Sequence, residues 1–216
     1  ASVTEEFSYT TQDANGATST STLTITITGT NDRPLITSLA ADAQGAVTEA
    51  GTSGAGTPTA TGTLTASDVD TGALATWFIT TTNGTYGTID IDPDTGEWTY
   101  ELDNTRPVTQ ALTAGATATE TFTARVTDEH GAFSEQVITI TITGTNDAPV
   151  AVADTDAATE AGVEDGGNTP TAGVVEATGS VLTNDTDVDD GETATLQVSA
   201  VAFGGLPGTV GTALVG

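Results

Sequence analysis

The stretch Ile140-Thr141-Ile142-Thr143-Gly144-Thr145-Asn146-Asp147-Ala148-Pro149 alternates Ile with Thr and then breaks into Gly, Asn, Asp and Pro. Alternation with a period of two is typical of a β-strand that buries one face, so the Ile side chains are predicted to face a core and the Thr side chains solvent. The residues that follow favour a turn. The same pattern ends at Pro34, 115 residues earlier (149 − 34). It therefore marks the last strand of a repeated β-unit.

The repeat extends beyond this stretch. Residues 5–34 recur without gaps as residues 120–149, and residues 61–70 resemble residues 178–189 with two extra residues in the later copy. Such self-similarity indicates tandem domains. We therefore expect an excerpt of an array, with these parts: residues 1–32 as the C-terminal part of one repeat, 33–147 as a complete repeat and 148–216 as the N-terminal part of a third.

Alternation and turn residues predict the strands of the complete repeat at about residues 34–39, 46–50, 60–66, 74–82, 85–92, 97–102, 119–127 and 134–143. Seven or eight strands suggest an immunoglobulin-like fold, so the predicted class is all-β, with tandem Greek-key β-sandwiches. The predicted core contains Ile89, Ile91, Trp98, Tyr100 and Leu102 from one hairpin, and Phe122, Ala124 and Val126 opposite Val137 or its neighbours.

Charge restricts the classes of partner. The chain has 30 acidic and 3 basic residues, a formal net charge of −27. This field repels nucleic acid and anionic membranes, and it favours bound multivalent cations. The chain has no Cys, no apolar run long enough to span a membrane and no basic-then-apolar start. We expect neither nucleic-acid binding nor membrane insertion, and an export signal encoded outside this segment.

Counting strands places the acidic loops at the two poles of the complete repeat. One pole is predicted to gather Asn31, Asp32, Asp68, Asp70 and Asp128, and the other Glu49, Asp103, Asn146, Asp147, Asp187 and Asp189. Calcium takes about 6–8 oxygen ligands in flexible geometry, which suits such loops better than magnesium. Calcium at both junctions is therefore the predicted cofactor. A simpler interpretation also exists, since Asn-Asp before Pro is a common turn and Asp-x-Asp arises by chance in acidic chains.

Several stretches resemble the calcium motifs of cadherin repeats: Ile91-Asp92-Pro93-Asp94-Thr95-Gly96, Leu102-Asp103, Thr127-Asp128-Glu129-His130-Gly131 and the stretch that ends at Pro149. The chain also resembles the bacterial cadherin-like repeat called VCBS, which occurs in tandem in giant RTX-type adhesins. The resemblance implies calcium ligands at Glu49, Asp68, Asp70, Asp103, Asp128, Asn146 and Asp147. Cadherins follow Leu-Asp with Arg-Glu, whereas this chain has Asn104-Thr105, so one bridging carboxylate is missing and fewer ions are expected at each junction.

The resemblance implies a secreted, extracellular repeat at the bacterial cell surface, which serves as a calcium-rigidified spacer in adhesion or biofilm formation. Its partners would be neighbouring repeats, with host or surface glycans and proteins bound through other domains. An alternative is a module that itself binds a glycan or protein, although both Trp residues lie in predicted strands. An enzyme is not expected, because the only His, His130, lies in a polar loop and nothing marks a catalytic cleft.

Overall fold

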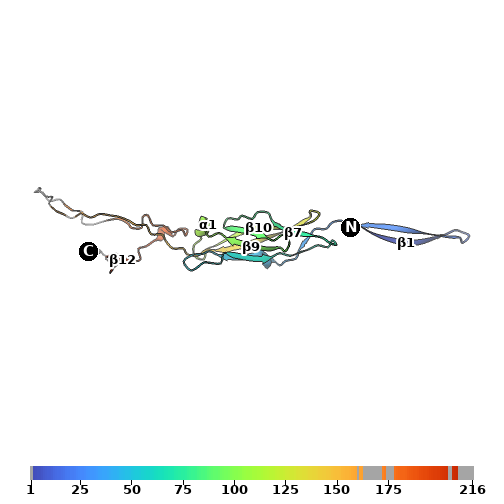
Figure 1. The fold of residues 1–216 in the computed structure, drawn as a ribbon, viewed down its shortest axis with the longest axis horizontal. Helices are drawn as coiled ribbons and strands as arrows, with labels where there is room; N and C mark the ends of the chain where they lie inside the picture. Colours follow the sequence, from blue (N-terminus) through green and yellow to red (C-terminus); the bar gives the residue numbers. More distant parts are fainter. Residues whose placement is uncertain (1, 160, 163–171, 174–177, 204–205, 209–216) are drawn as a thin grey trace.

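A computed structural model describes residues 2–159, 161–162, 172–173, 178–203 and 206–208. The molecule is elongated (Figure 1). A hairpin of β1 (Ser2–Gln12) and β2 (Thr18–Thr28) projects from one end of a central β-sandwich, and the chain after residue 143 leaves from the other end. β1 begins near the junction with the sandwich and runs outward, and β2 returns to the junction.

Two sheets form the sandwich. One has the order β4 (Gln44–Thr48), β11 (Phe133–Thr143), β10 (Thr117–Asp128) and β7 (Ala75–Ile79), in which only the β4–β11 pair is parallel. The other has the order β5 (Thr59–Thr63), β9 (Glu97–Leu102) and β8 (Gly87–Ile91). The predicted class, an all-β sandwich of the immunoglobulin and cadherin type, is confirmed.

Shorter elements complete the chain. They are β3 (Leu35–Ile36) paired with β6 (Ala66–Ser67), the 3-10 turns η1 (Ala40–Ala43) and η2 (Thr193–Thr195), the single-turn helix α1 (Pro107–Gln110), and β12 (Val201–Phe203) paired with β13 (Leu206–Gly208). The strand predicted at 34–39 is shorter than expected, because the chain turns into η1 where Leu39 N donates to Asp42 Oδ2 at 2.8 Å. Alternation carries no signal for these turns.

The core follows the predicted alternation. Ile138, Ile140 and Ile142 of β11 are fully buried, while the Thr residues between them lie on the outer face. Val137 does not enter the core and stays half-exposed, since Phe122 is paired with Ile138 rather than with Val137. A shift of one residue along a strand exchanges its two faces, so this register decides which side chain is buried.

Trp98 lies at the centre of the sandwich with no exposed surface, and its Nε1 donates to Asp42 O at 2.9 Å. Gly62 of the adjacent β5 makes room for the indole, because a Cβ there would come within 2.6 Å of Trp98 Cζ2. Gly96 allows the β8–β9 turn, with a φ of +72° that favours glycine. The aromatic residues of this hairpin are core residues, as predicted.

The β1–β2 hairpin has the same register as β10–β11, but its apolar face is open. Phe7 and Leu23 are paired as Phe122 and Ile138 are, and both are about half-exposed. The opposite face of the hairpin consists of Ser, Thr, Glu and Gln residues only. The hairpin therefore has the residue pattern of a buried pair of strands, but no sheet of the described residues packs against it.

Candidate metal centres

The first junction lies between β2 and β3. Asn31 Nδ2 donates to Asp128 Oδ2 at 2.8 Å, and the backbone N of Asp32 donates to Asp70 Oδ2 at 2.8 Å. Asp68 Oδ2 is buried and accepts no hydrogen bond from the part of the chain that the structure describes. The structure thus brings together the five residues that the sequence predicts at this pole, with one carboxylate oxygen still to be satisfied.

Asp128 ends β10 and is only 7% exposed. The hydrogen bond from Asn31 and the backbone N–H groups of Ala132 and His130 hold its pKa below the ordinary value, although burial opposes this. Asp128 is therefore a stable anion at neutral pH. His130 itself is exposed and lies 3.6 Å from Glu129, as expected for a residue of a polar loop.

The second junction contains Glu49, which follows β4 and has no exposed surface. Its Oε2 accepts from Thr145 N at 3.2 Å and its Oε1 from Gln110 Nε2 at 3.1 Å. Burial, together with the charges of Asp147 and Asp189, raises the pKa of Glu49 from 4.5 to about 7, against the effect of these two hydrogen bonds. A nearby cation would reverse this shift.

At the second junction, the linker that follows β11 (Asn146 and Asp147) meets the loop that contains Asp187 and Asp189. The backbone N of Asp147 donates to Asp189 Oδ2 at 2.8 Å, and Asn146 Nδ2 donates to the carbonyl oxygen of Asp147. Asp147 Oδ2 and Asp189 Oδ1 are buried, and neither accepts a hydrogen bond from a described residue. Burial and the charges of Asp189 and Asp187 raise the pKa of Asp147.

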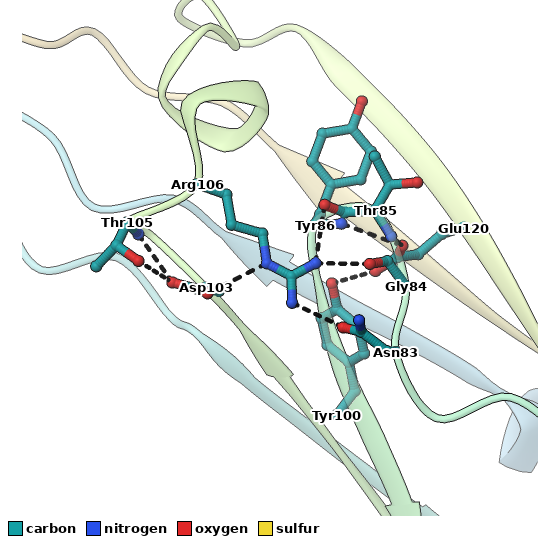
Figure 2. Close-up of polar contacts among 9 residues, drawn as sticks. All are labelled: Asn83, Gly84, Thr85, Tyr86, Tyr100, Asp103, Thr105, Arg106 and Glu120. Atoms are coloured by element: carbon teal, nitrogen blue, oxygen red, sulfur yellow. Dashed lines mark hydrogen bonds and ion pairs between the residues drawn. The ribbon is translucent and has the colours of Figure 1, made fainter.

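Asp103 is held differently. Its Oδ1 accepts from Thr105 N and Oγ1, and its Oδ2 from Arg106 Nε at 3.1 Å (Figure 2). These contacts keep its pKa below the ordinary value, with the Thr105 hydrogen bonds as the largest cause. The structure thus brings Glu49, Asn146, Asp147, Asp187 and Asp189 to the second junction, and it directs Asp103 toward Arg106.

Glu192 is a carboxylate of the second junction that is not among the residues predicted from the sequence. One carboxylate oxygen from each of Asp187, Asp189 and Glu192 lies within 4.8 Å of the other two. The central repeat has Ala73 at the equivalent loop position, so a search for repeated residues passes over Glu192. Comparison of the two Asp-x-Asp loops residue by residue would have found it.

A β-sandwich with an acidic junction at each end supports the class of an extracellular, adhesion-type repeat. Residues 31–144 match the model of the bacterial cadherin-like domain, and the chain belongs to this family. Domains of the family are extracellular and typically non-enzymatic, and cadherin-like domains generally bind calcium. Among the residues that the structure describes, no helix has the length and apolar character needed to cross a membrane.

Solved structures similar to the chain include two crystal structures. One is mouse cadherin-23 EC22-24, at 17% identity and a TM-score of 0.46, with 88% of this chain and 55% of that chain covered. The other is the protocadherin gamma B4 extracellular domain, at 17% identity and a TM-score of 0.42, with 70% and 23% covered. The chain thus spans about a quarter to a half of these relatives. No curated protein matches it.

Proposed function

We propose that this chain is a calcium-rigidified spacer in the stalk of a secreted bacterial cell-surface adhesin. The observation that carries the proposal is the second junction. There a hydrogen bond from Asp147 N to Asp189 Oδ2 connects the linker to the next loop. The side chains of Asp147 and Asp189 each have a buried carboxylate oxygen that accepts no hydrogen bond from a described residue.

Buried charges without a partner are costly, and neighbouring carboxylates repel one another. A calcium ion at this place would supply the positive charge and the oxygen coordination that the junction lacks. Because Glu49 comes from the central sandwich, Asp147 from the linker and Asp189 from the next loop, shared coordination would fix all three parts relative to one another. At the first junction, an ion shared by Asp128, Asp32 and Asp70 would fix the linker to the sandwich in the same way.

In this proposal the repeats are those predicted from the sequence: residues 1–32, 33–147 and 148–216. They are VCBS-type repeats of an RTX-type adhesin that supports cell adhesion or biofilm formation. Their direct partners are neighbouring repeats of the same chain, and any host or surface glycan is bound by other domains. The support is the family, the internal repeat and the elongated arrangement in Figure 1.

A second candidate function, a module that binds a glycan or protein by itself, is favoured by one surface. On the outer face of the four-stranded sheet, the Arg125 guanidinium lies 4.0 Å from the ring centroid of Phe133 and 5.6 Å from that of Phe78. Both rings are about 40% exposed and line a hollow of about 510 Å³ beside Leu74. Exposed aromatic residues are typical of binding surfaces.

The test of the spacer function is thermal unfolding with and without calcium. An ion that binds only the folded junction stabilises it by about 2.7 kcal/mol at a hundredfold excess over Kd. We expect the melting midpoint to rise in millimolar calcium and much less in magnesium. An unchanged midpoint contradicts the proposal. A glycan array then separates the two candidates: binding that is lost in Phe133→Ser favours the second.

A further inference from the structure

The two Asp-x-Asp loops can be compared contact by contact. In the first, the backbone N of Asp70 donates to Asp68 Oδ1 at 2.9 Å, and the backbone N of Ala73 donates to Asp70 O at 3.2 Å. Gly72 has a φ of +82°. The outer oxygen of the loop, Asp70 Oδ2, accepts from the linker at Asp32 N.

The second loop repeats each of these contacts. The backbone N of Asp189 donates to Asp187 Oδ1 at 3.0 Å, and the backbone N of Glu192 donates to Asp189 O at 3.2 Å. Gly191 has a φ of +79°, and Asp189 Oδ2 accepts from Asp147 N. The backbones of the two loops therefore have the same conformation, and Glu192 occupies the position of Ala73.

This substitution changes what the loop can bind. Ala73 has no ligand atom, whereas a carboxylate oxygen of Glu192 lies within 4.8 Å of ligand oxygens of both Asp187 and Asp189. Three such oxygens can share one cation, since calcium–oxygen contacts are about 2.3–2.6 Å.

An independent observation indicates that this cluster is a site rather than a chance gathering of acids. Asp189 is 2% exposed, and its Oδ1 has no hydrogen-bond partner among the described residues, although its Oδ2 is bound by the linker. A carboxylate oxygen buried in this way needs a counter-charge. Solvation explains an exposed acidic cluster, but it does not explain Asp189.

We propose that Glu192 is a third carboxylate ligand of a calcium ion that Asp187 and Asp189 hold, and that it makes the second loop bind calcium more tightly than its sequence repeat, the first loop. The inference rests on the proposed function, because it assumes calcium at the junctions. Calcium affinity in protein loops is tuned over several decades by the number of charged ligands. Repeats with the same fold would then become rigid at different calcium concentrations.

The experiment is a calcium titration of the full chain followed by NMR, with the amide resonances of Gly72 and Gly191 as separate reporters of the two loops. Glu192→Ala and Glu192→Gln are expected to raise the midpoint at Gly191 at least about tenfold and to leave that at Gly72 unchanged. Ala73→Glu is expected to lower the midpoint at Gly72. Because Glu49 also lies at the second junction, each variant is compared with the wild-type protein at the same reporter.

Asp190→Asn is the matched control. Asp190 is the exposed neighbour of Asp189 and lies outside the three-carboxylate cluster, so its variant removes one charge and should leave the Gly191 midpoint within about twofold. The inference is overturned if Glu192→Ala moves this midpoint no further than Asp190→Asn does. If neither glycine responds to calcium in the wild-type protein, the proposed function itself fails.

Discussion

At the scale of single residues, Glu49 makes the stability of the second junction depend on pH. The side chain is buried next to two other carboxylates, and its pKa is raised to about 7. In the unfolded chain it would ionise near 4.5. Between these values the native state binds more protons than the unfolded state, so stability is lost as pH rises from about 4.5 to about 7.

We expect Glu49→Gln to remove this loss in calcium-free buffer, because the amide keeps the volume of the side chain and has no charge to bury. Relative to the wild-type protein, the variant should gain on the order of 3 kcal/mol in unfolding free energy between pH 4.5 and pH 8, as an upper bound. Urea denaturation at the two pH values measures it. In calcium the order should reverse, since the carboxylate is then a ligand.

Glu97→Gln, at an exposed position of β9, is the control for the loss of one charge. If both variants depend on pH in the same way, burial of Glu49 is not the cause.

At the scale of elements, Arg106 connects α1 to the loop between β7 and β8. Besides Asp103, its guanidinium donates to Gly84 O at 2.6 Å, Thr85 O at 3.0 Å and Asn83 Oδ1 at 2.9 Å (Figure 2). The same loop is held from its other side by Glu120.

Glu120 of β10 accepts from the backbone N of Thr85 at 2.7 Å and also from the Tyr100 hydroxyl (Figure 2). Burial, followed by the bond to Glu120, raises the pKa of Tyr100, so this hydroxyl stays a donor. Arg106 and Glu120 thus connect the β7–β8 loop to α1, to β10 and, through Tyr100, to β9.

We expect Arg106→Ala to destabilise the sandwich by about 2 kcal/mol, because two backbone carbonyls lose their donor. Arg106→Lys should restore only part of this, since an ammonium group lacks the planar fork that reaches several acceptors. Chemical denaturation measures both variants.

Arg125→Ala is the matched comparison. Arg125 pairs with Glu135 on the exposed face, where an ion pair contributes about 1 kcal/mol or less. Equal effects of the two Arg→Ala variants would show that the loop contacts of Arg106 add nothing.

At the scale of the whole molecule, the two junctions lie at opposite ends of the sandwich. Asp128 belongs to the first and Thr145 to the second, and β11, whose 11 residues span about 36 Å, lies between them. No single ion can therefore contact both junctions.

We expect Asp128→Ala to loosen only the hinge between the β1–β2 hairpin and the sandwich, and Asp189→Ala only the hinge that follows β11. Spin labels placed in pairs across each junction, at saturating calcium, would show a broader distance distribution at the affected hinge. Asp103→Ala should change the second hinge less than Asp189→Ala, because Arg106 holds Asp103. If Asp128→Ala broadens the second hinge, the assignment of residues to junctions is wrong.

The sequence by itself determined what depends on local pattern. The alternation of Ile140 and Ile142 with Thr defines a strand with one buried face, because successive side chains of a strand point to opposite faces. Gly96 defines a turn, because glycine adopts a positive φ without a steric cost. The repeat placed the junction loops, since residues 5–34 and 120–149 fold into hairpins with matching pairs. Fold class and most members of the candidate sites were accessible in this way.

Only the tertiary structure decided which oxygen atoms meet. Asp103 and Asp189 are both acidic loop residues, but their contacts differ. Asp103 accepts a hydrogen bond from Arg106, which also donates to the β7–β8 loop. Asp189 is buried and accepts a hydrogen bond from the linker at Asp147 N. Glu192 joins the second site through the fold of its loop, in a position that the other repeat fills with Ala73. Sequence spacing describes the path of the chain, whereas ligand geometry and burial depend on contacts between segments far apart in it.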